Sequence, residues 1–196
     1  MALPLVTTIG DRCRVCYTCV RECPAKAIRI SGGQAEVIND RCIGCGNCVQ
    51  VCSQKAKQVM RSVEKVQEML ATPGRRLSAC IAPSFPVEFS DCPPEQFLGM
   101  VRALGFELVN EVAFGADLVS ERYHDLVKDY ADTGKHFLAT ACAAAVKYVE
   151  HLSPHLTDSL APIASPMVAM ARYVHRMYGD DVDVVFVGPC IAKKAE

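Results

Sequence analysis

The sequence predicts two parts, a small cysteine-rich α+β domain and, after it, an α/β domain with a mainly parallel sheet. The first part is predicted by eight of the twelve cysteines, which fall between Cys13 and Cys52 in two runs separated by a pair of β-prone segments. The second part is predicted by strand-like and helix-like segments that alternate from Leu77 onward. Such alternation is typical of right-handed crossovers between parallel strands.

The two cysteine runs have the same spacing. The first reads Cys-x-x-Cys-x-x-Cys-x-x-x-Cys-Pro over residues 13–24, and the second repeats it over residues 42–53 with Ser53 in place of the proline. Three cysteines at this spacing converge on one 4Fe–4S cluster, and the fourth of each run ligates the other cluster in two-cluster ferredoxins. We therefore predict two 4Fe–4S clusters with interlocked ligands. One set is Cys13, Cys16, Cys19 and Cys52, and the other is Cys42, Cys45, Cys48 and Cys23.

A hairpin is expected between the runs. Ala27–Ile30 and Glu36–Ile38 are β-prone and flank a Ser-Gly-Gly-Gln turn signal. Gly44 and Gly46 lie inside the second run, where backbone close to a cluster needs permissive torsions. These features define a first domain over residues 1–56 with an α+β ferredoxin-like two-cluster fold, in which neither half completes its site alone and cluster assembly accompanies folding.

Two other uses of the cysteines are weaker. A disulfide framework needs an oxidising compartment, and residues 1–10 have neither the basic region nor the apolar core of a signal peptide. Zinc ribbons use pairs of Cys-x-x-Cys, so a third and a fourth cysteine in each run exceed what a tetrahedral site can use. The five histidines, His124, His136, His151, His155 and His175, show no ligand pattern.

Composition limits the classes of partner. The formal net charge is −1 and no basic run occurs, which argues against nucleic acid and anionic membranes. No apolar stretch reaches the roughly 18 residues of a membrane-spanning helix. Twelve cysteines without secretory targeting predict a reducing, cytoplasmic setting, which also suits oxygen-sensitive clusters. The expected partners are redox proteins that donate or accept electrons.

The rest of the chain reads as a linker and a second domain. Residues 57–76 are the linker, with a helix over 57–72 that carries Lys57 on a polar face. The second domain covers residues 77–196. Its expected strands are 77–82, 106–114, 136–140 and 182–187, and its expected helices are 96–104, 116–130, 143–152 and 167–178. Pro83, Ser84, Cys142 and Cys190 all follow predicted strand ends, where ligand groups gather on parallel sheets.

Short sequence motifs in the second domain resemble motifs of the iron-only (FeFe) hydrogenases and occur in the same order. The stretch Gly-Pro-Cys-Ile-Ala-Lys-Lys-Ala-Glu at 188–196 resembles the family's second signature, Pro-Cys-x-x-Lys-Lys-x-Glu. Thr-Ala-Cys at 140–142 resembles the first signature, Ser-Cys-Cys-Pro. Three further motifs resemble the family, namely Ala82-Pro83-Ser84, Phe114-Gly115-Ala116-Asp117 and Ser165-Pro166-Met167.

The resemblance implies an H-cluster, which is a 4Fe–4S cube joined through a cysteine sulfur to a diiron unit with carbonyl and cyanide ligands. It implies that Cys142 and Cys190 ligate the cube and that Lys193 and Ser84 donate to the cyanides. Pro83 and Pro189 would line the pocket. A third 4Fe–4S cluster or an H-cluster-like centre is therefore expected in the complete protein.

The chain departs from the family where protons are delivered. Its relay cysteine is here Ala141 and a relay serine aligns with Ala161, so the series of titratable groups that proton delivery needs is broken. The third signature, with two more cysteines, is absent, and nothing in the chain geometry suggests that Cys80 and Cys92 replace it. We therefore expect residues 77–196 to be the N-terminal part of an H-cluster domain, completed by a C-terminal part or by a sensor or kinase domain.

The expected function is electron transfer through two 4Fe–4S clusters within a sensory or low-activity hydrogenase-like protein. Two alternatives stay open. One is a fragment of a catalytic hydrogenase subunit, and the other is an iron–sulfur cluster scaffold.

Overall fold

A computed structural model describes residues 4–196 and divides the chain into two compact units. The cysteine-rich unit contains Met1–Arg61, Phe137–Ala161 and Cys190–Glu196, and the sheet unit contains Ser62–His136 and Pro162–Pro189. Both units are thus built from separated stretches of sequence. The domain boundaries expected after residues 56 and 76 follow chain order, and they stay predictions. Each unit is described by itself below.

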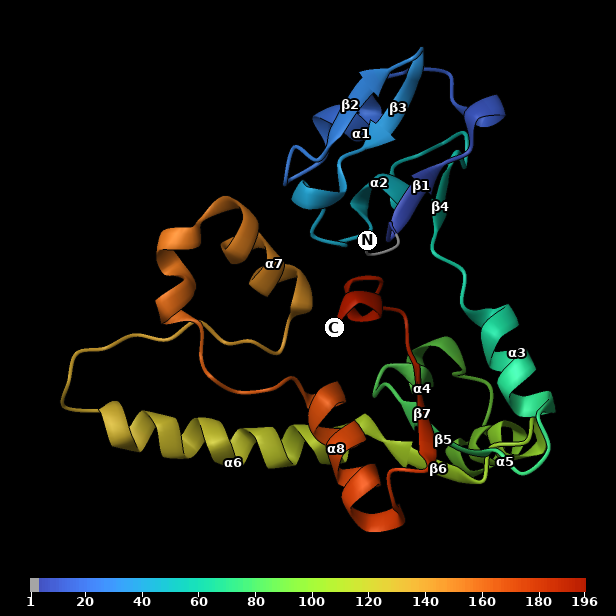
Figure 1. Cartoon of the computed structure of the whole chain (residues 1–196), viewed down its shortest axis with the longest axis vertical. Helices are drawn as coiled ribbons and strands as arrows, with labels where there is room; N and C mark the ends of the chain where they lie inside the picture. The colour runs from blue at the N-terminus through green and yellow to red at the C-terminus, as the bar shows by residue number, and fades with distance from the viewer. Residues whose placement is uncertain (1–3) are drawn as a thin grey trace. The chain divides into compact units, whose positions relative to one another are not determined.

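Short elements make up the amino-terminal part of the cysteine-rich unit. They are β1 (Val6–Thr8), α1 (Thr18–Arg21), β2 (Ile28–Ser31), β3 (Gln34–Val37), α2 (Asn47–Gln50) and β4 (Lys57–Val59). Strand β1 pairs antiparallel with β4, and β2 pairs antiparallel with β3 (Figure 1). A 3-10 turn precedes each cysteine run, at Gly10–Arg12 and at Asn39–Arg41.

The backbone of this part repeats after 29 residues. The equivalent of Val6 is Ala35 and the equivalent of Val59 is Ile30. Val6 pairs with Val59, and Ala35 likewise pairs with Ile30. Left-handed torsions recur at the same interval, at Val15 and Gly44, at Tyr17 and Gly46, and at Lys26 and Lys55. Non-glycine residues rarely adopt such torsions, so their recurrence shows that both cysteine runs require one particular backbone path.

The predicted hairpin is confirmed. Ser31 pairs with Gln34, which leaves Gly32 and Gly33 as a two-residue turn, and both glycines have positive φ. This is the torsion requirement of the turn type that suits the twist of antiparallel strands. The predicted helix over 57–72 is wrong at its start, because residues 57–59 form β4 and the helix α3 covers Val63–Ala71. The partner that draws Lys57–Val59 into a strand is β1, about fifty residues earlier in the chain.

Two later segments complete the cysteine-rich unit. Helix α7 (Ala143–Leu152) matches its prediction, and Leu152 packs against the core around Cys19 and Cys23. The chain's last residues form a short 3-10 turn, Ala192–Ala195. A Cβ added at Gly44 would lie 2.9 Å from Ala192 Cα, and one added at Gly46 would lie 2.8 Å from Ile191 Cδ1. Val15 and Tyr17 adopt the same torsions in the first run, so the close approach of the Ala192 backbone is what requires glycine at Gly44.

The sheet unit is built on a three-stranded parallel sheet in the order β6-β5-β7. Its strands are β5 (Arg76–Ile81), β6 (Leu108–Glu111) and β7 (Val182–Val187), and its helices are α3, α4 (Phe85–Glu88), α5 (Pro94–Ala103), α6 (Val112–Tyr130) and α8 (Pro166–Tyr178). The predicted parallel sheet is confirmed, as are the helices over α5, α6 and α8. The Ser165 hydroxyl caps α8 by accepting from the amide of Val168.

Two element predictions in this part are wrong. The strand expected over 106–114 ends at Glu111, because Val112 already begins helix α6. The strand expected over 136–140 is only a single bridge between Leu138 and Leu160, outside the three-stranded sheet. Cys142 consequently does not follow a strand end. It lies at the start of α7, in the cysteine-rich unit.

Alternation along β5 divides the core of the sheet unit. Leu77, Ala79 and Ile81 face a cluster that includes Phe97 and Val101 of α5, and Cys80 faces the side covered by α8. Burial raises the pKa of Cys80 to about 11, so its thiol stays protonated and acts as a small apolar core group.

Helices α6 and α8 pack closely (Figure 1). Their approach depends on Gly115, where an added Cβ would lie 2.3 Å from the carbonyl oxygen of Pro166 and 3.0 Å from Met170 Cβ. Helix α6 therefore tolerates no side chain at this position without a shift of α8. No helix within residues 4–196 has the length and apolar character that crossing a membrane requires.

A pair of glycine substitutions tests this contact. Gly115→Ala should destabilise the sheet unit by about 1–3 kcal/mol, because the new methyl group overpacks α6 against α8. Gly99→Ala, in α5 with open space around the new Cβ, should instead stabilise it by about 0.5–1 kcal/mol through helix propensity. Hydrogen exchange of amides in α5, α6 and α8 measures both effects. Equal protection in the two variants would contradict the contact.

Candidate iron–sulfur centres

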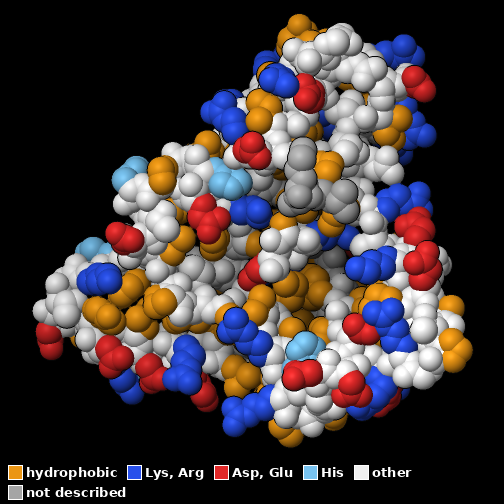
Figure 2. Space-filling view, viewed as in Figure 1, with side chains coloured by type: hydrophobic (Ala, Val, Ile, Leu, Met, Phe, Trp, Pro, Cys, Tyr) orange, Lys and Arg blue, Asp and Glu red, His pale blue; other side chains and the backbone are white. Residues whose placement is uncertain are grey.

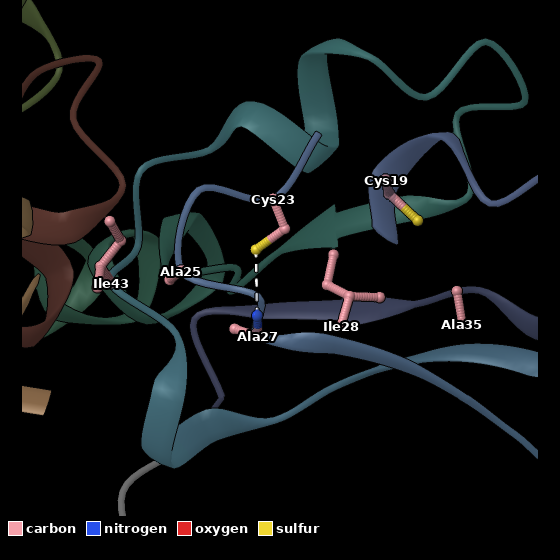
Figure 3. Close-up of a cluster of buried hydrophobic side chains, with 7 residues drawn as sticks. All are labelled: Cys19, Cys23, Ala25, Ala27, Ile28, Ala35 and Ile43. Carbon is pink, nitrogen blue, oxygen red and sulfur yellow. Dashed lines mark hydrogen bonds between the residues drawn. The ribbon is translucent and has the colours of Figure 1, made fainter. Parts of the chain in front are cut away.

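The four cysteines of the second predicted set lie around one hollow. Cys42, Cys45 and Cys48 line it together with Cys23 of the first run, and its apolar wall includes Ile28 and Val37; Val6 and Ile43 line it as well. Figure 3 shows Cys23, Ala27 and Ile28 from this wall together with Ile43. The fold thus brings a thiol of one run to three thiols of the other. Within residues 4–196 no group of three His, Cys, Asp or Glu side chains is arranged to hold a single metal ion.

Backbone amides point at the fourth cysteine of each run. The amide of Ala27 donates to Cys23 Sγ at 3.2 Å, drawn as the dashed line in Figure 3, and the amide of Ala56 donates to Cys52 Sγ at 3.3 Å. The two bonds are 29 residues apart, so the repeat extends to the sulfur contacts. Amide donation to a thiolate stabilises its negative charge and suits a sulfur that ligates iron.

The surroundings of the two cysteine runs differ despite the shared backbone. Hydrogen bonding by the Ala35 backbone lowers the pKa of Cys13, and the Thr18 side chain lowers the pKa of Cys16. In the second run burial raises the pKa of Cys42, and burial raises the pKa of Cys48 to about 11. The polar surroundings of the first run are confined to Cys13 and Cys16, because burial also raises the pKa of Cys19.

One buried charge in this region was missed from the sequence. Lys57 was expected on a solvent-facing helix, yet its side chain is buried beside the cysteines. The 29-residue interval could have found it, because it makes Lys57 the equivalent of Ile28, which belongs to a β-prone segment.

Cys142 and Cys190 both belong to the cysteine-rich unit, and both are exposed. Their segments are joined by Lys193, whose Nζ donates to the carbonyl oxygen of Ala141 at 3.0 Å and pairs with Glu196 at 2.5 Å. The Lys193 side chain is only 11% exposed. The structure thus connects the segments of the two signature cysteines through this lysine.

The other predicted site residues belong to the sheet unit. Ser84 and Pro189 line a cleft of about 600 Å³ beyond the carboxyl ends of β5 and β7, together with Phe85, Phe89 and Val187. Pro83 is exposed directly before Ser84. The parallel register aligns Ile81 with Val187, which explains why the residues after these two strands meet at one edge.

The two alanines at the relay positions are placed differently. Ala141 accepts the Lys193 bond through its carbonyl oxygen, and Ala161 is 4% exposed with its amide bonded to the carbonyl oxygen of Leu138. Neither side chain can carry a proton.

Acidic and basic side chains are intermixed on the face drawn in Figure 2. In the sheet unit, Arg76 pairs with Glu107 at 2.8 Å and with Asp181 at 3.0 Å. These groups join β5 to the segments that flank β6 and β7, and they are solvent-exposed, so we assign them a structural role.

Comparison with known families identifies the class of protein. Residues 5–53 match the 4Fe–4S dicluster domain, so the chain is an iron–sulfur redox protein with a ferredoxin-like part. Residues 75–196 match the iron-only hydrogenase large subunit, C-terminal domain. This match covers more than half of the chain, and the chain belongs to that family. The resemblance inferred from the short signatures is confirmed.

The lysine contact described above can be tested directly. Lys193→Met removes both bonds, so the local opening free energy should fall by about 1–2 kcal/mol. Amide exchange in residues 139–142 and 192–196 should then accelerate roughly tenfold. Lys128→Met, an exposed change in α6, is the control. Unchanged exchange would contradict the contact, and acceleration extending over β2 and β3 would indicate general unfolding of the unit instead.

Proposed function

We propose that the chain transfers electrons through two 4Fe–4S clusters, as part of a sensory or low-activity hydrogenase-like protein. The observation that carries the proposal is the hollow lined by Cys23 together with Cys42, Cys45 and Cys48. Four thiols from two runs, with amide donation to sulfur, suit a four-thiolate cluster. When bound, such a cluster takes up and releases one electron. A reducing, cytoplasmic setting suits these thiols.

The ligand sets are interlocked. We assign Cys42, Cys45, Cys48 and Cys23 to one cluster, and Cys13, Cys16, Cys19 and Cys52 to the other. Support for the second assignment comes from the repeat, since these four cysteines have the same backbone path and the same amide-to-sulfur bond. Each run needs the other to complete its ligands, so the two-cluster fold forms as one unit with its metal.

Cys142 and Cys190 are proposed to ligate a further centre, a third 4Fe–4S cluster or an H-cluster-like group in the complete protein. The packing of Ile191 and Ala192 on Gly46 and Gly44 supports this, because it holds Cys190 next to the second run. Helix α7 begins directly after Cys142 and packs through Leu152 against the core that includes Cys19, Cys23 and Ile43. We propose Lys193 and Ser84 as donors to this centre and Pro83 and Pro189 as its lining.

The sensory role is favoured by what the relay positions contain. A hydrogenase with fast turnover needs titratable groups in an unbroken series. Ala141 and Ala161 offer only backbone groups, and the carbonyl oxygen of Ala141 and the amide of Ala161 already have hydrogen-bond partners. Redox proteins that donate or accept electrons are the proposed partners, with a sensor or kinase domain as a further one.

A scaffold role is the second candidate, because Cys142 and Cys190 are exposed and exposed cysteines are accessible to another protein. Transfer of iron and sulfide from the loaded chain to an apo-ferredoxin would support it. Retention of the clusters in that assay would favour electron transfer.

Iron content tests the two-cluster proposal. Anaerobic reconstitution should give about eight iron atoms per chain. Cys45→Ala should reduce this to about four or fewer, because it removes one ligand from a shared fold. Cys92→Ala, outside both runs, should leave about eight. About four irons in the unsubstituted chain, or zinc in place of iron, would contradict the proposal.

Infrared spectroscopy tests the further centre. After maturation, the protein that contains this chain should show carbonyl and cyanide bands. Cys190→Ala should abolish them, because it removes a proposed cube ligand, and Cys92→Ala should keep them. A mature protein without such bands would rule out the diiron group and leave a plain 4Fe–4S cluster or a scaffold.

A further inference from the structure

Lys57 is a buried cation inside the cysteine-rich unit. Its side chain lies on β4 and the residue is 7% exposed. Its Nζ donates to Thr8 Oγ1 at 2.6 Å and to the carbonyl oxygen of Ala35 at 3.1 Å. Within residues 4–196 the ion pairs of the structure do not include Lys57. A buried ammonium with only neutral acceptors is costly, so an opposite charge is expected nearby.

The cysteines lie beside this charge. Ala35, whose carbonyl oxygen accepts from the Lys57 ammonium, belongs to a core cluster that includes Cys19 and Cys23. Cys13, Cys42 and Cys48 pack against the same cluster. Lys57 therefore holds a positive charge next to thiols of both cysteine runs.

The internal repeat shows that the charge is present in one half only. The residue equivalent to Lys57 is Ile28, which is 6% exposed and lines the hollow of Cys23 and Cys42. Their strand partners are also equivalent, with Thr8 beside Lys57 and Val37 beside Ile28. One half thus has a Lys–Thr pair where the other has an Ile–Val pair on the same backbone.

We propose that Lys57 is an internal counter-charge to the two clusters and makes the cluster of Cys13, Cys16, Cys19 and Cys52 the easier one to reduce. The inference rests on the proposed function, since it needs two bound clusters. A four-thiolate cluster is negative and gains one more negative charge on reduction. A nearby buried positive charge stabilises the reduced form more than the oxidised one, which raises the reduction potential.

The other half of the repeat shows that a neutral residue fits at the position of Lys57. Isoleucine already occupies it on β2, in the same pairing and at the same burial. Lys57→Ile therefore transfers one half's residue to the other. Lys57→Gln removes the charge but keeps a donor for Thr8 and Ala35, so it separates the effect of charge from that of hydrogen bonding.

The experiment is a redox titration of the reconstituted chain, followed by electron paramagnetic resonance of the reduced clusters. In both Lys57 variants the midpoint potential of the cluster that is reduced first should fall. The reduced fraction of this cluster at a fixed potential should decrease about tenfold, which is equivalent to about 59 mV for a one-electron couple. The midpoint potential of the other cluster should fall less, so the two midpoint potentials should become more similar. Because the charge is buried, the shift should persist at high salt.

Lys55→Met is the matched control, since it removes an exposed lysine two residues away. Its effect should be small and should vanish at high salt. Unchanged steps in the Lys57 variants, or a shift in Lys57→Ile but not in Lys57→Gln, would overturn the role of the charge. Iron content is measured in the same samples. About eight irons with unshifted steps would refute this inference alone, whereas fewer irons in the unsubstituted chain would refute the two-cluster function.

Discussion

The arrangement of the cysteine-rich unit depends on a backbone that must turn tightly between successive cysteines. With two residues between thiols that face one point, the intervening backbone enters the left-handed region, and it does so at Val15 and Tyr17 as well as at Gly44 and Gly46. Valine and tyrosine are disfavoured there. The torsional cost must therefore be offset by the rest of the structure, and iron–thiolate bonds are a sufficient source.

The difference between the two runs at these positions has a packing reason. Glycine occurs in the run that other parts of the unit cover, since Ala192 and Ile191 occupy the space that side chains at Gly44 and Gly46 would need. The first run has side chains at the equivalent positions, and Tyr17 is half exposed. The same backbone path is thus partly exposed in the first run and packed against other segments in the second run. This explains how a symmetric repeat supports an asymmetric unit.

Local signals were enough to predict much of this structure. The hairpin followed from a Gly-Gly turn, and β5, β7 and the long helices followed from periodicity within single segments. Strands β1 and β4 were missed because each has three residues and its partner is about fifty residues away. Lys57 was placed on the wrong kind of element for the same reason. Such strands exist through pairing and have little preference of their own.

The candidate site divides in the same way. Cysteine spacing predicted which thiols gather, since Cys23 lies with Cys42, Cys45 and Cys48. The sequence did not predict that Phe137–Ala161 and Cys190–Glu196 belong to the cysteine-rich unit. That association depends on non-local contacts of Leu152 and Ile191. Chain order alone placed these segments in the second sequence domain, whereas the compact units of the fold are built from separated stretches of the chain.

Lys193 shows how one side chain can serve both the fold and a bound group. An ammonium has three N–H donors, and here two of them are used by the carbonyl oxygen of Ala141 and by Glu196. These bonds fix the direction of the third donor before any group binds. An anionic ligand placed in that direction would meet a donor that has already lost most of its conformational freedom, which lowers the entropic cost of binding. The carboxylate of Glu196 also balances the charge when no such ligand is present, so the lysine can stay buried in both states.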